Sequence, residues 1–190
     1  MQVVNRKVEQ ANIIVGCPSL TATDSRRYVM SVLNSILGGG MSSRLFQEIR
    51  EKRGLVYSTY SFASAYADAG YFGMYAGCSP QKVGQVIGLL VEELEKLAAD
   101  GVSEGELKKA LGQLSGGIVL GMEDSGSRMS RLGRSELVSG QFMDIDETLG
   151  CIRAVTAEQV QELARELAAA PRTMTVVGPF EETETFGLKL

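Results

Sequence analysis

Three consecutive glycines followed by one short amphipathic segment constrain this chain more than any other feature. Gly38–Gly40 interrupt an apolar helical pattern, Gly54 closes the segment that follows, and strand-like sequence begins at Leu55. Glycine adopts the backbone conformations that end helices and form tight turns. The order predicts a helix, a glycine turn, a short helix, a second turn and a strand. Arg50 and Tyr57 then lie on either side of the second turn, and both can donate hydrogen bonds to a carbonyl oxygen or an oxyanion.

The sequence contains no histidine, which removes the usual general base and the commonest metal ligand. No Ser–His or Cys–His catalytic pair can therefore be formed. The cysteines Cys17, Cys78 and Cys151 are widely spaced, which favours buried apolar side chains over a disulfide or a CxxC metal site. We expect no metal, no cofactor and no self-contained hydrolytic site in this chain.

Size and charge narrow the class of protein further. The chain has 190 residues, 44% of them hydrophobic and 22% charged, which is enough for one domain over residues 1–190. A net charge of −4 disfavours nucleic acid and anionic membrane surfaces as partners. No apolar run approaches the roughly 20 residues needed to span a bilayer, and residues 1–7 lack the apolar core of a signal peptide. We expect a cytoplasmic protein without a nucleic-acid or membrane partner.

The order of the expected elements indicates an α+β fold. In sequence these are strand segments within residues 3–16, a helix capped by Asp24, the short helix ending at Gly54, strands at 55–66 and 70–78, helices at 81–99, from Ser103, at 127–138, at 145–153 and from Thr156, and a strand at 173–179. Ser103 with Glu106 and Thr156 with Gln159 form capping boxes. This pattern predicts two layers, a largely antiparallel sheet with helices packed on one face. Residues 180–190 are expected to form a loose tail.

The two central strands are expected to form an antiparallel hairpin rich in aromatic residues. Strict alternation puts Val56, Tyr60, Phe62 and Tyr66 on one face, and Tyr57, Thr59, Ser61 and Ala63 on the other. We expect most hairpin rings to belong to the core, and Tyr57 to point from the more polar face toward something else.

Four stretches of the sequence resemble the C-terminal domain of the M16 zinc peptidases, the family of pitrilysin, insulysin and the mitochondrial processing peptidase. The resemblance is carried by Gly38-Gly39-Gly40-Met41-Ser42-Ser43-Arg44-Leu45-Phe46 through Gly54-Leu55-Val56-Tyr57-Ser58, by Val8-Glu9-Gln10-Ala11, by residues 68–77 and by residues 127–134. It covers roughly residues 3–179. The similarity implies the metallohydrolase fold of the LuxS and mitochondrial-processing-peptidase type.

The resemblance also implies a division of labour between two domains. In such enzymes an N-terminal domain holds Zn²⁺ with an H-x-x-E-H motif, and a C-terminal domain without zinc closes over an unfolded peptide substrate. The C-terminal domain offers an Arg and a Tyr to the substrate backbone, and these correspond by spacing to Arg50 and Tyr57. This chain would then be inactive alone and would need an N-terminal zinc-binding domain, in the same polypeptide or a separate subunit. The resemblance leaves open whether the protein also forms a homodimer.

Several alternatives stand beside that interpretation. Arg50 also suits an ordinary helix end, and Tyr57 an ordinary sheet contact. The same fold can serve as a non-catalytic scaffold or interaction domain. A nucleotide site at Gly40–Ser43 would need a lysine that the loop lacks.

Other arginines have ordinary roles in the prediction. Arg44 and Arg53 are expected to be surface or pairing residues. The stripe Arg128, Arg131 and Arg134 is expected to be a solvated face paired with nearby acids such as Glu123, Asp124 and Glu136, with an inter-domain surface as the alternative.

Overall fold

The sheet of this protein has five strands and is antiparallel except at one pair. A computed structural model describes residues 1–140 and 142–186. The strands are β1 (Gln2–Asn5), β2 (Ala11–Pro18), β3 (Val56–Ala65), β4 (Gly70–Cys78) and β5 (Thr173–Gly178). Their order across the sheet is β1-β5-β2-β4-β3, and only β1 and β5 run parallel. Strand β3 is thus an edge strand and β4 its antiparallel hairpin partner.

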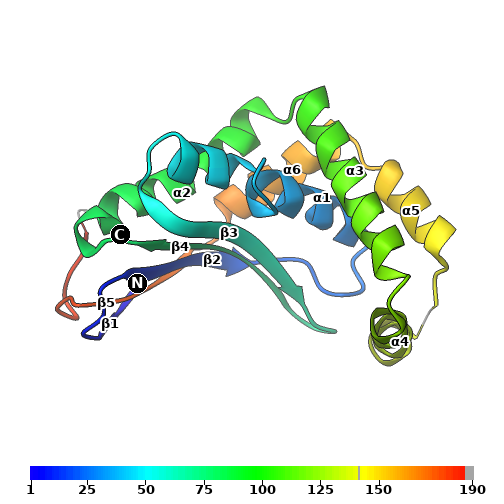
Figure 1. The fold of residues 1–190 in the computed structure, drawn as a ribbon, viewed down its shortest axis with the longest axis horizontal. Coiled ribbons are helices and arrows are strands. Elements are labelled where there is room, and N and C mark those ends of the chain that lie inside the picture. The colour runs from blue at the N-terminus through cyan, green and yellow to red at the C-terminus, as the bar shows by residue number, and fades with distance from the viewer. Residues whose placement is uncertain (141, 187–190) are drawn as a thin grey trace.

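Helices cover one face of this sheet (Figure 1). They are α1 (Arg27–Gly38), α2 (Val83–Asp100), α3 (Glu104–Gly121), α4 (Ser125–Arg134), α5 (Ile145–Arg153) and α6 (Ala157–Ala169). Shorter helical pieces are η1 (Phe46–Glu51), η2 (Pro80–Lys82) and η3 (Ser135–Ser139). The predicted α+β, two-layer architecture with a largely antiparallel sheet is confirmed.

Local capping chemistry sets several helix starts where the sequence predicts them. Both capping boxes form, at Ser103 for α3 and at Thr156 for α6. The predicted cap at Asp24 is wrong by two residues, since α1 is preceded by Arg26. Asp24 instead accepts a hydrogen bond from the Arg26 backbone N–H at 2.7 Å, which shapes the turn before the helix.

The core lies between the sheet and helices α1, α2 and α6. Alternate residues of β2, such as Ile13 and Val15, point into it and meet fully buried helix residues such as Leu33. Burying each such side chain contributes roughly 1.5–3 kcal/mol. The prediction of buried cysteines holds for Cys17 and Cys78, but Cys151 is only partly buried. Burial raises the pKa of the Cys78 thiol to about 11.

The other face of the sheet is where the prediction for the aromatic hairpin is wrong. Of the aromatic rings of the hairpin, only Phe72 is fully buried, whereas Tyr60, Tyr66 and Tyr71 are exposed. The helices cover a single face (Figure 1), so these rings pack on one another. Tyr60 stacks on Tyr75 with ring centres 4.8 Å apart.

The C-terminal tail can be compared with its prediction only in part. The tail expected to be loose includes residues 187–190, which lie outside the described residues. Within the described part, Phe180 and Phe186 meet edge to face at 4.9 Å and pack against the core.

No helix among residues 1–140 and 142–186 is both long and apolar enough to cross a membrane.

Candidate functional site

The segment between the glycine run and β3 is helical but wider than the α-helix that its spacing suggests. Its backbone bonds include Lys52 N–H to the Gln47 carbonyl at 3.0 Å, a π-helical separation of five residues. The buried Ile49 anchors the inner side of η1. Gly54 ends the segment with φ of +61°, a conformation that favours glycine.

Arg50 differs from its neighbours in having no carboxylate partner among the described residues. Its guanidinium carbon lies 4.7 Å from the centre of the Phe46 ring, and the side chain is exposed. Arg44, by contrast, donates to Glu106 at 2.7 Å, and Arg53 donates to Glu48 at 2.8 Å. Arg44 and Arg53, predicted to be surface or pairing residues, are thus both paired, whereas Arg50 has no such partner among the described residues.

Tyr57 lies in an irregularity of the edge strand. Val56 pairs with Cys78 and Ser58 pairs with Gly77, so Tyr57 is an extra residue in a β-bulge. Its side chain is 73% exposed. In the bulge Tyr57 has no paired residue on β4, and its phenol is open to solvent.

The bulge also overturns the predicted face for Tyr57. Thr59 and Ser61, its expected companions, are buried. The Ser61 hydroxyl donates to the Asn34 side chain of α1 at 2.7 Å, on the helix-covered face. One inserted residue shifts the alternation of every residue after it, and Val56 consequently does not share the face of Tyr60.

Arg50 and Tyr57 therefore flank one turn, each in irregular backbone, and each projects into solvent. Among the described residues no hydrogen bond joins the two, and the Arg50 guanidinium lies over the Phe46 ring instead. Two unpaired donors at one corner can bind an oxygen that carries partial or full negative charge. The sequence singled out both residues as candidates, but it did not predict the π-helical turn or the bulge in which they lie, because neither has a local sequence signal.

The residues present do not fit a metal. Among the described residues no three His, Cys, Asp or Glu side chains are grouped so as to hold an ion. Two carbonyls of the glycine run already accept hydrogen bonds from side chains of the protein. The Ser43 hydroxyl donates to the Gly40 carbonyl at 2.6 Å, and Gln113 donates to the Gly39 carbonyl at 2.9 Å. A nucleotide site at Gly40–Ser43 gains no support from these contacts.

The arginine stripe on α4 does not pair as predicted. Within the described part of the chain, none of its three members forms an ion pair with the acids named for it. Arg131 instead donates to the backbone carbonyls of Met143 and Asp144 and to the Thr148 hydroxyl, at 2.8–3.1 Å. It therefore fastens the start of α5 to α4.

Comparison with known proteins gives matches over most of the chain. Residues 1–114 match the family model described as the peptidase M16 inactive domain. An uncharacterized zinc protease of Streptomyces coelicolor is 47% identical over 184 residues, which is 97% of this chain and 40% of that protein. An uncharacterized zinc protease of Mycobacterium leprae is 45% identical over 97% of this chain and 42% of its own length. The chain spans about two fifths of these relatives.

Solved structures share the fold at lower identity. A peptidase M16 inactive domain from Pseudomonas fluorescens superposes with a TM-score of 0.84 at 21% identity, over 96% of this chain and 44% of that one. A chain of Complex III2 from Candida albicans superposes with a TM-score of 0.84 at 18% identity, over 97% of this chain and 46% of that one. One fold thus occurs in a peptidase M16 inactive domain and in a chain of Complex III2.

Proposed function

Because this chain belongs to the M16 peptidase family, we propose that it is the substrate-enclosing half of a zinc-dependent endopeptidase. In this role it closes over an unfolded peptide and supplies Arg50 and Tyr57 to the scissile carbonyl. The zinc ion belongs to an N-terminal domain that this chain does not contain, and the chain alone is inactive. The relatives are more than twice as long as the matched region and are named zinc proteases, which supports a partner domain of that kind.

One observation carries the proposal. Arg50 is the cation without a described carboxylate partner in its segment, and Tyr57 is the exposed phenol of the β-bulge that follows the same turn. Irregular backbone of both types recurs at functional sites. The guanidinium and the phenol would donate to the carbonyl oxygen and bind it more tightly as negative charge develops there. Each donor of this kind contributes roughly 2.7–4 kcal/mol to the transition state.

The test uses the full-length polypeptide, or this chain combined with its zinc-binding domain. Arg50→Ala and Tyr57→Phe should each lower kcat for peptide cleavage by about 100-fold, while KM changes little. Arg53→Ala is the matched control because Arg53 is paired with Glu48 and should keep kcat within about twofold. Unchanged kcat in both Arg50 and Tyr57 variants would remove the proposed role, and cleavage by the 190 residues alone would contradict the division of labour.

A second candidate is a scaffold or interaction domain of the same fold. The neighbour from Complex III2 favours it, because that chain's structure is named for an assembly and not for a protease. A scaffold does not need an unpaired Arg50 beside an exposed Tyr57. Failure of the combined protein to cut any peptide, with zinc bound, would favour this candidate.

A further inference from the structure

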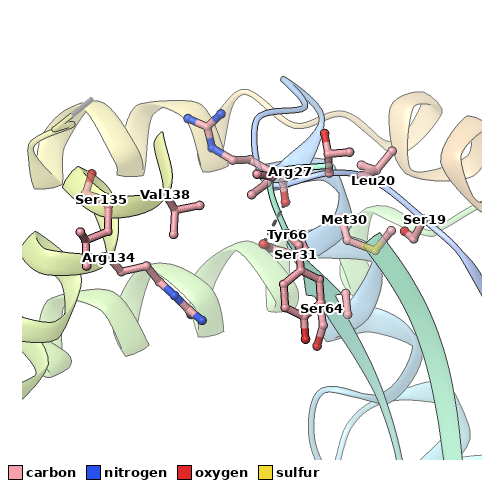
Figure 2. Close-up of a pocket in the computed structure, with 16 residues that line it drawn as sticks. Ser19, Leu20, Arg27, Met30, Ser31, Ser64, Tyr66, Arg134, Ser135 and Val138 are labelled. Atoms are coloured by element: carbon pink, nitrogen blue, oxygen red, sulfur yellow. Dashed lines mark hydrogen bonds between the residues drawn. The ribbon is translucent and has the colours of Figure 1, made fainter. Parts of the chain in front are cut away.

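The opposite end of β3 borders an open pocket that the sequence does not suggest. Its volume is about 660 Å³, and it lies between the β3–β4 hairpin tip, the start of α1 and the α4–η3 segment. Arg27 of α1 and Arg134 of α4 line it, and none of its described lining residues is an aspartate or glutamate. Figure 2 shows the Arg134 side chain reaching from its helix toward the wall that carries Tyr66. In a chain of net charge −4, this pocket is a local site of attraction for anions.

Neither arginine is neutralised by a carboxylate of the described residues. Arg27 donates to the Tyr28 hydroxyl at 3.3 Å and to the Met143 sulfur at 3.4 Å, and its guanidinium lies over the Tyr28 ring. Arg134 is exposed and makes no ion pair within residues 1–140 and 142–186. A smaller adjoining pocket of about 300 Å³ shares Arg27 and adds Arg131, again with no acidic residue in its described lining. The positive region therefore extends over both pockets.

Hydroxyl groups on the walls complete a set of hydrogen-bond donors. Ser64 and Tyr66 add hydroxyls from the hairpin. Guanidinium and hydroxyl donors together suit the two oxygens of a carboxylate.

The remaining walls suit a polypeptide better than a small free anion. Leu20, Met30, Leu137 and Val138 give the pocket apolar surface beside the two arginines. Leu137 is 87% exposed, so its side chain is available to a ligand. Mixed apolar and cationic walls accommodate a carboxylate that is carried on a chain.

We propose that this pocket binds an acidic side chain of an extended peptide, as a specificity site remote from Arg50 and Tyr57. The proposal rests on the proposed function, in which a peptide is held at the Tyr57 end of β3. Tyr57 and Ser64 are seven positions apart on this strand, a distance of about 23 Å at 3.3 Å per residue. A peptide that follows β3 would therefore place an acidic residue in the pocket about seven positions from the bond held at Tyr57.

The test measures peptide binding to the chain itself, without cleavage. The probe is a fluorescein-labelled peptide of about ten uncharged residues containing two adjacent glutamates, and the matched peptide has glutamines in their place. Fluorescence anisotropy should show binding of the acidic peptide that is about tenfold tighter than that of its amide counterpart and that weakens in high salt. Arg134→Gln should weaken binding of the acidic peptide about fivefold and leave the amide peptide unaffected.

The control variant is Arg128→Gln, since Arg128 lies on the same helix but lines neither of the two pockets. It should bind the acidic peptide like the unmodified chain. Equal binding of the two peptides, or an unchanged affinity in Arg134→Gln, would overturn the proposal. So would displacement of the acidic peptide by inorganic phosphate at a concentration similar to that of the peptide, because the pocket would then be a simple anion site. Arg50→Ala and Tyr57→Phe should retain the acidic preference, so failure of the catalytic role and failure of this site are separable.

Discussion

Two segments of this protein each carry three arginines, and they differ in whether those arginines form ion pairs. In the segment before β3, Arg44 and Arg53 pair with glutamates, and Arg50 does not. In α4, none of Arg128, Arg131 and Arg134 forms an ion pair with a described carboxylate, and Arg131 bonds to backbone and hydroxyl groups of α5. The comparison separates arginines that hold the fold from arginines that are free to bind. Only the second kind is a candidate for function.

The largest expected effect on stability comes from Arg44, whose side chain is only 18% exposed. It bonds to both oxygens of Glu106 and to the Gly101 carbonyl at 2.7–3.1 Å. Arg44→Ala removes these three hydrogen bonds and leaves Glu106 with Ser103 as its remaining donor, and Glu106 also caps α3. We expect a loss of about 2 kcal/mol in the free energy of unfolding, measured by urea denaturation. A loss below about 0.5 kcal/mol would show that this pair does not hold α3 to the segment before β3.

The same pair makes stability depend on acid. Burial acts to raise the pKa of Glu106, but hydrogen bonds from Arg44 and Ser103 outweigh it and lower the pKa to about 2 from an ordinary 4.5. A depressed carboxyl pKa stabilises the fold above the unfolded pKa, and this contribution is lost as pH falls from about 4.5 toward 2. Urea denaturation across that range should show a steeper loss for the unmodified protein than for Glu106→Gln. Parallel curves for the two proteins would contradict this origin of the acid sensitivity.

Arg131 should give a smaller effect than Arg44, because its partners lie in a more exposed part of the molecule. Arg131→Ala removes three hydrogen bonds at the start of α5, and we expect a loss of about 1 kcal/mol. Hydrogen exchange should become faster in α5, where those bonds are made. Unchanged exchange in α5 would mean that α4 and α5 are not coupled through this residue.

The smallest effects on stability should come from the arginines that are free to bind. Arg50→Ala, Arg128→Ala and Arg134→Ala remove exposed side chains without a carboxylate partner among the described residues. We expect each to change the free energy of unfolding by no more than about 0.5 kcal/mol. A large destabilisation by Arg50→Ala would move Arg50 into the structural group and weaken the comparison.

Local signals made much of the fold predictable. Each capping box needs only two residues three apart, and both boxes formed at the predicted sites. The hairpin and the order of helices and strands followed from periodicity and glycine placement, and together they fixed the α+β class.

Features that depend on distant contacts were not predictable in this way. Glu106 is 62 positions from Arg44, so no local pattern indicates the pair. The bulge at Tyr57 is defined by the register against β4 and changes which residues are buried after it. The aromatic rings were assigned to the core because sequence alone does not tell which face of a sheet the helices leave open. The pocket beside Arg134 joins three segments far apart in the chain, and its residues carry no shared motif.

The most direct test of the central claim compares a tetrahedral transition-state analogue with an uncut substrate in the zinc-loaded full-length protein. A phosphinic peptide presents negatively charged oxygens where the scissile carbonyl would lie, so a donor that acts on the developing charge should bind it preferentially. The account predicts that Tyr57→Phe weakens inhibition by the phosphinic peptide about 100-fold while KM for the matching substrate changes by less than about threefold. Equal changes in both quantities, or no change in either, would contradict the role assigned to Tyr57.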